Sequence, residues 1–228
     1  MEPRGKKTKT QSTGLKLVPV EAKTPRQKDL FRCFRENQVI SLSGYAGTGK
    51  TFIAMYQALK AVENKDFDKL LIIRSAVASR QIGFLPGNKK EKMEVYEGPY
   101  ISNATKLYER SDAYQILKQR NVIQFEGSAF FRGETFDNTI VIIDEAQNMS
   151  EMELYTLLTR VGENCKIIIC GDVKQDDLTN ERYKEVSGYI NILQILDRVP
   201  DYYEAINFEI DDIVRSGFVR EFIIASTK

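Results

Sequence analysis

The sequence contains no histidine and only three cysteines among its 228 residues. The absence of histidine removes the usual acid–base residue near neutral pH, the commonest metal ligand and any Ser-His-Asp triad. Cys33, Cys165 and Cys170 include no Cys-x-x-Cys pair, which argues against a disulfide framework or a zinc site. Any chemistry must therefore use carboxylates, lysine, arginine, backbone amides or a metal ion held by oxygen ligands.

The sequence also lacks an excess of charge and any long apolar run. The chain has 33 lysines and arginines and 32 aspartates and glutamates, so its net charge gives no reason to expect a nucleic-acid partner. Any attraction to nucleic acid must come from a local basic patch. No apolar run approaches the about 20 residues that span a bilayer, and the N-terminal segment lacks the apolar stretch of a secretory signal. We therefore expect a cytoplasmic protein without a membrane partner.

Residues 1–23 differ in character from the rest of the chain. They carry six lysines and arginines among glycine, serine and threonine. This composition predicts a flexible basic N-terminal arm, which either contacts a phosphate backbone or only aids solubility. We assign the remaining residues, 24–228, to a single folded domain.

Apolar segments alternate with helical patterns along that domain. Strand-like apolar runs occupy residues 38–43, 69–74, 121–125, 139–143, 166–170 and 203–208. Helical patterns occupy residues 24–36, 50–62, 150–161, 187–199 and 211–223. The strands are apolar without alternation, as expected when helices cover both faces of a parallel sheet. The sequence therefore predicts an α/β fold with a doubly wound, mostly parallel sheet.

Residues 44–51, GYAGTGKT, match the P-loop pattern GxxxxGK[ST] between a predicted strand and a predicted helix. Glycines let the backbone curl so that its N–H groups face an anion, and the helix adds the positive end of its dipole. The Lys50 ammonium can reach the β- and γ-phosphates, and the Thr51 hydroxyl can bind Mg²⁺. We predict an ATP site formed by Gly44, Tyr45, Ala46, Gly47, Thr48, Gly49, Lys50, Thr51 and Phe52.

Two adjacent acids, Asp144 and Glu145, end the apolar run 139–143. In a P-loop fold a strand beside the loop ends in an acid that holds Mg²⁺ through water, and Asp144 fits that place. Glu145 can then orient and polarise the attacking water. Gln175 follows another apolar run and either senses the γ-phosphate or lies in a simple turn.

Five segments together resemble the PhoH family of ATPases: GYAGTGKT, RSAVASRQIGFLPG, FFRGETFDNTIVIIDEAQN, LTRVGENCKIIICGDVKQDDL and DDIVRSGFV. The resemblance covers about residues 24–225 and is specific in its GFLPG and FRG segments. It implies a RecA-like core related to superfamily 1 helicases, ATPase activity on RNA or other nucleic acid, and assembly into rings. It also implies that Gln27 reads adenine, the alternative being a surface residue of a helix.

Three arginines, and a set of lysines and phenylalanines, each have more than one possible role. By the resemblance, Arg215 reaches the γ-phosphate in its own subunit or in a neighbour's. Arg132 can hold nucleic acid or the loops of the core, and Arg74 ends a predicted strand. For all three arginines the alternative is a structural ion pair. Candidates for a nucleic-acid surface, which can equally be core phenylalanines and a solvated lysine face, are Lys89, Lys90, Lys92, Phe130 and Phe131.

These observations predict a Mg²⁺-dependent ATPase that acts on RNA or single-stranded DNA in a helicase-like manner. Because the chain has length for one core only, we expect a homo-oligomer, a hexameric ring, with each site at a subunit boundary. The alternatives are a nucleotide-switched assembly module and a P-loop kinase of small molecules. The Asp-Glu pair favours hydrolysis over phosphate transfer.

Overall fold

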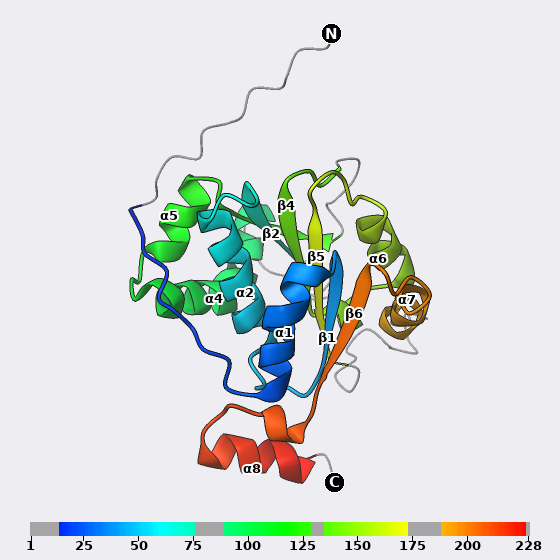
Figure 1. Ribbon diagram of the computed structural model, residues 1–228. Helices are drawn as coiled ribbons and strands as arrows, with labels where there is room; N and C mark the ends of the chain where they lie inside the picture. The colour runs from blue at the N-terminus through cyan, green and yellow to red at the C-terminus, as the bar shows by residue number, and fades with distance from the viewer. Residues whose placement is uncertain (1–13, 76–88, 129–134, 173–187, 227–228) are drawn as a thin grey trace.

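The sheet is the organising element of the fold. The computed structural model describes residues 14–75, 89–128, 135–172 and 188–226, and side chains of residues 89–94 are not among those described. Its sheet has six strands, ordered β3-β2-β4-β5-β1-β6, and every pairing is parallel. The strands are β1 Val39–Gly44, β2 Lys69–Arg74, β3 Ile123–Gly127, β4 Thr139–Asp144, β5 Lys166–Gly171 and β6 Tyr203–Phe208 (Figure 1). The predicted α/β fold with a parallel sheet is confirmed.

Helices cover both faces of this sheet (Figure 1). One face packs against α1 Pro25–Glu36, α2 Lys50–Glu63, α4 Lys89–Tyr108 and α5 Ala113–Gln119. The other packs against α6 Glu151–Leu158 and α7 Tyr189–Leu196. The short 3₁₀ helices are η2 Ala146–Asn148 and η3 Ile210–Asp212. No helix in the described ranges is both long and apolar enough to cross a membrane.

Strand β4 explains why the runs are apolar without alternation. Ile140 and Ile142 belong to the core on the α2 face, whereas Val141 and Ile143 belong to the core on the α6 face. Successive strand side chains point to opposite faces, so both sets must be apolar when both faces are covered. A parallel sheet also gathers the carboxyl ends of its strands at one edge, where ligands bind in such folds.

The strand order sets the spacing between the phosphate loop and the acids. The acid-bearing strand β4 does not lie directly beside the phosphate-loop strand β1, because β5 is paired between them. The end of β5 is formed by Cys170 and Gly171. These small residues leave space between the loop after β1 and the acids at the end of β4.

The predicted helix over residues 211–223 is wrong in its first half. The chain forms η3, then an extended and irregular stretch, and only then α8 Gly217–Ser226. In that stretch the backbone N–H of Val214 donates to the carbonyl oxygen of Gly47 at 3.1 Å. The segment is therefore held by the phosphate loop instead of by its own helical hydrogen bonds.

Part of the segment predicted as an arm, residues 14–23, lies within the described residues and packs on the core. Leu15, Leu17 and Val20 pack against the core on the α2 face. The backbone N–H of Val18 donates to the carbonyl oxygen of Leu107 at 2.8 Å, at the end of α4. Residues 1–13 lie outside the described residues, and the next ten form a strap along the folded core (Figure 1).

Candidate nucleotide-binding site

The phosphate loop depends on glycines whose backbone is unfavourable for other residues. Gly44, Gly47 and Gly49 have φ angles of +120°, +78° and +82°. A Cβ atom on Gly44 would also lie 2.0 Å from the main-chain oxygen of Phe208 in β6. Any larger residue there must displace backbone, so β6 and the loop can approach this closely only with glycine.

Lys50 begins α2 and turns its amine back over the loop. The amine donates to the carbonyl oxygens of Gly44 and Tyr45 at 2.6 and 2.8 Å. Burial lowers the pKa of Lys50, while the nearby negative charge of Asp172 opposes that change. An ammonium that donates to carbonyl oxygens in this half-buried loop is well suited to donate to phosphate oxygens in their place.

Thr51 and Asp144 connect the loop to the acid strand. The Thr51 hydroxyl donates to Asp144 Oδ1 at 3.0 Å across 93 positions of sequence. A hydroxyl and a carboxylate are hard oxygen ligands, which fits Mg²⁺. In the described part of the chain no three histidine, cysteine or acidic side chains gather as a metal-binding group. Further ligands of a Mg²⁺ ion here must then come from phosphate and water.

Glu145 occupies a strained position between several polar groups. Its φ and ψ angles are +54° and +43°, a left-handed conformation that is costly for a residue other than glycine. Gln147 donates to its carboxylate at 2.7 Å and accepts a hydrogen bond from the backbone N–H of Asp172 at 3.1 Å. Burial raises the pKa of Glu145, and the adjacent charge of Asp144 raises it further.

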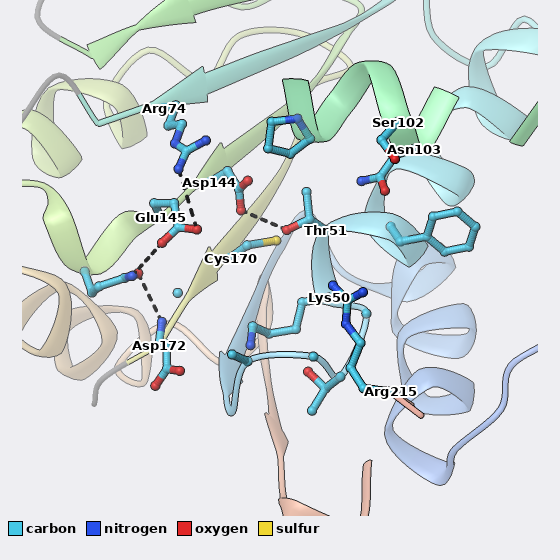
Figure 2. Close-up of a pocket in the computed structure, with 18 of the residues that line it drawn as sticks. Lys50, Thr51, Arg74, Ser102, Asn103, Asp144, Glu145, Cys170, Asp172 and Arg215 are labelled. Atoms are coloured by element: carbon cyan, nitrogen blue, oxygen red, sulfur yellow. Dashed lines mark hydrogen bonds and ion pairs between the residues drawn. The ribbon is translucent and has the colours of Figure 1, made fainter. Parts of the chain in front are cut away.

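Arg74 resolves one of the alternatives left by the sequence. Its guanidinium lies 3.9 Å from the Glu145 carboxylate and 5.6 Å from the ring centre of Tyr96 on α4. Figure 2 shows Arg74 and Glu145 facing each other beside Asp144. Arg74 therefore forms an ion pair, and it does so with a residue of the candidate site.

Arg215 lies over the phosphate loop of its own chain. A Cβ atom added to Gly47 would lie 2.8 Å from Arg215 Cγ, and both residues line a cavity of about 390 Å³. Lys50, Asp144 and Glu145 line the same cavity (Figure 2). The structure thus brings predicted phosphate, metal and water-orienting groups to one hollow at the carboxyl edge of the sheet.

A second cavity of about 260 Å³ is lined by Gln27 together with Gly47 and Gly49 of the loop. Gln27 is only 2% exposed, so the alternative of a surface helix residue is wrong. Its amide donates to the Thr48 carbonyl oxygen at 3.0 Å and accepts from the backbone N–H of Lys23 at 2.8 Å. Phe52 and Arg215 line both cavities, which therefore adjoin.

Comparison with known proteins agrees with this geometry. A family model described as "PhoH-like protein" matches residues 19–226. This chain belongs to the PhoH family. It is 35% identical over 209 residues to a PhoH-like protein of Synechocystis and 34% identical over 210 residues to one of Bacillus subtilis.

The relatives in the PhoH family are longer than this chain. The two alignments cover 90% and 92% of the chain, but 62% and 64% of the relatives. Protein PhoH of Escherichia coli is 31% identical over 209 residues, 58% of its length. Among solved structures, the large terminase of a thermophilic bacteriophage has a TM-score of 0.54 at 11% identity, covering 91% of this chain and 51% of the terminase chain. That likeness shows the fold alone, a RecA-like P-loop core.

Several residues predicted for this PhoH-family site lie outside the described residues. They are Gln175, Arg132, Phe130 and Phe131. Lys89, Lys90 and Lys92 lie in α4 by their backbone, but their side chains are not among those described. Their assignment to the γ-phosphate or to nucleic acid stays a prediction.

The structure also adds residues that the sequence analysis missed. Gln147 connects Glu145 to Asp172, just after β5. Gln147 lies in one of the segments that resemble the family, but no role was predicted for it from the sequence. From α4, Tyr100 donates to Asp144, and Asn103 and Lys106 line both cavities. The signal in the sequence was weak, because α4 showed only a general helical character there.

Proposed function

We propose that this PhoH-family chain binds Mg²⁺-ATP and hydrolyses it. One observation carries the proposal: Lys50, Thr51, Asp144 and Glu145 line a single cavity. The first two come from the loop after β1 and the acids from the end of β4, so the sheet fixes their spacing. Hydrolysis of a phosphoanhydride is assisted by one group that holds the metal and another that orients the attacking water, and this pair of acids can provide both.

Each side chain has a defined task in this proposal. Lys50 exchanges its carbonyl partners for phosphate oxygens, and Thr51 and Asp144 hold Mg²⁺, which neutralises charge on the phosphates when bound. Glu145 accepts the proton of the attacking water, and its raised pKa makes it a stronger base than an exposed carboxylate. Arg215 faces the phosphate loop and stabilises the charge that develops on the γ-phosphoryl group.

The cavity beside Gln27 is proposed to hold the adenine ring. It adjoins the phosphate cavity through Phe52 and Arg215 and includes the apolar side chains of Val20 and Val214. A glutamine amide can donate to N7 and accept from the N6 amino group of adenine. The Gln27 amide has one further N–H and one further lone pair for this, because each of its two backbone partners uses only one.

We further propose that single-stranded RNA or DNA stimulates turnover and that the active form is a homo-oligomer, a hexameric ring. The support is that the described strands form one core, whereas movement along a strand requires cores that open and close against each other. Neighbouring copies can supply the second core through head-to-tail contacts.

The test is phosphate release from Mg²⁺-ATP, measured with and without single-stranded RNA and DNA. Glu145→Gln should retain nucleotide binding and lose turnover by about a thousandfold. Glu126→Gln, at the exposed position of β3, is the matched control and should hydrolyse normally. Normal hydrolysis by Glu145→Gln, or a phosphorylated small molecule in place of free phosphate, would contradict the proposal.

The oligomer is tested separately by light scattering after size-exclusion chromatography with ATP. Mass near six chains together with strand-stimulated hydrolysis supports the ring. A fully active monomer would remove the oligomer from the proposal and leave the hydrolysis intact.

A further inference from the structure

Helix α4 places a buried tyrosine directly against the predicted metal-holding acid. Tyr100 is 0% exposed, and its hydroxyl donates to Asp144 Oδ2 at 2.8 Å. Its ring packs on Phe125 of β3, with the ring centres 5.4 Å apart. The ring is therefore fixed by packing from two elements, and its hydroxyl is aimed at the end of β4.

The Asp144 carboxylate consequently has a hydroxyl donor on each oxygen. Thr51 donates to Oδ1 from the end of the phosphate loop, and Tyr100 donates to Oδ2 from α4. Two donors on different oxygens define both the direction and the plane of the carboxylate. The two bonds differ in function, because the Thr51 hydroxyl must reorganise when its oxygen takes a metal ion, whereas Tyr100 belongs to no part of the loop.

The Tyr100 hydroxyl and the Asp144 carboxylate are both buried, at 0% and 6% exposure, so neither group is open to solvent. A buried carboxylate deprived of one donor would have an unsatisfied oxygen, which is costly. The Tyr100 hydroxyl therefore satisfies Asp144 Oδ2 without using any group of the phosphate loop.

We propose that Tyr100 is a positioning residue for Mg²⁺ binding at this site. It holds Asp144 by Oδ2, so that Oδ1 faces Thr51 and the place where a metal ion would join loop and strand. The inference rests on the proposed function, because it concerns the metal of the Mg²⁺-ATP complex. It assigns to α4 a role beyond forming a wall of the cavity.

The experiment compares nucleotide affinity with and without Mg²⁺ in Tyr100→Phe, using a fluorescent ATP analogue. The substitution keeps the ring and removes only the hydroxyl. Affinity in excess chelator should equal that of the wild-type protein, because Lys50 and the loop are unchanged. The enhancement of affinity by Mg²⁺ should fall about tenfold, the size expected for one hydrogen bond to a charged group.

Tyr114→Phe is the matched control. Tyr114 is equally buried and donates to a carboxylate, Glu97, at 2.6 Å, but it lies on α5 and lines neither cavity. It should keep the full Mg²⁺ enhancement, and thermal melting of both variants shows whether they are folded. In an Asp144→Asn background, adding Tyr100→Phe should cause no further loss of enhancement.

The outcomes separate the two proposals. If wild-type protein binds no nucleotide, the proposed function fails. If wild-type protein binds with a Mg²⁺ enhancement that Tyr100→Phe fully retains, the positioning role alone is overturned. A loss that Tyr114→Phe shares equally, or a loss in chelator as great as that in Mg²⁺, also overturns it, because a general structural effect would produce it.

Discussion

Arg74 lies opposite Asp144 in the register of β2 and β4, and its guanidinium reaches the carboxylate of the next residue, Glu145, at 3.9 Å. Strand pairing thus sets a cation beside the proposed base. Arg74 lowers the pKa of Glu145, whereas burial and the Asp144 charge raise it by a larger amount. Opposing effects therefore set the pKa of Glu145, and a single substitution can shift it.

The first prediction concerns pH dependence. Glu145 must be ionised to accept a proton, so activity falls as pH falls through its pKa. Arg74→Gln removes a cation that favours the ionised form, so the pKa of Glu145 should rise and the acid limb of kcat/KM should move to higher pH. Arg110→Gln, which breaks an exposed ion pair with Asp112, is the control and should leave the limb in place. An acid limb unmoved by Arg74→Gln would contradict the proposed balance.

The second prediction compares two glycines by chemical unfolding. Gly44→Ala puts a Cβ 2.0 Å from the Phe208 carbonyl oxygen at a φ of +120°, so it should cost on the order of 3 kcal/mol or more. Gly217→Ala, at the start of α8, has no positive φ and nothing within 4 Å of the added Cβ, so it should change stability by less than about 1 kcal/mol. A Gly44→Ala protein as stable as the wild type would show that the loop and β6 can separate at little cost.

Much of the fold could be predicted because it is encoded locally. The four inner strands β2, β4, β5 and β1 are short apolar runs, and the P-loop pattern between a strand and a helix located the phosphate loop. The helix over 211–223 failed since its early residues bond to Gly47, a contact that helical periodicity cannot reveal. Tyr100 and Asp144 lie 44 residues apart, and a buried tyrosine on a helix resembles any other core residue in sequence.

The third prediction decides whether Arg215 acts within its own subunit. In the structure it lies over Gly47 of the same chain, and the adjacent Val214 is bonded to that loop residue. Arg215→Ala should lower kcat by about a thousandfold. Mixing this variant with Lys50→Ala subunits should restore nothing, because each site would still lack one of its own groups.

Arg220→Ala serves as the control for that experiment. Arg220 lies on α8 and pairs with Asp211 and Glu221, and it lines neither cavity. It should hydrolyse ATP normally. Activity that reappears when Arg215→Ala and Lys50→Ala subunits are mixed would place the acting arginine across a subunit boundary.

The fourth prediction concerns a buried lysine at the opposite edge of the sheet. Lys166 begins β5, donates to the Asn37 carbonyl oxygen and lies 5.2 Å from the Phe34 ring centre. Burial lowers its pKa to about 8. Below that pH the folded protein must hold a charged amine away from water, whereas the unfolded chain keeps the ordinary pKa of 10.5. Folding stability from this residue is therefore lost at low pH and gained as pH rises from about 8 to about 10.5.

Lys166→Met should accordingly raise the free energy of unfolding by about 1–3 kcal/mol near neutral pH, and the gain should shrink at about pH 10. Lys69→Met is the matched control, since Lys69 begins β2 and bonds to the Gln124 side chain without full burial. It should change stability little and without this pH dependence. Urea unfolding at both pH values measures the difference. A Lys166→Met protein that is less stable near neutral pH would mean that the carbonyl and ring contacts outweigh the cost of burying the charge.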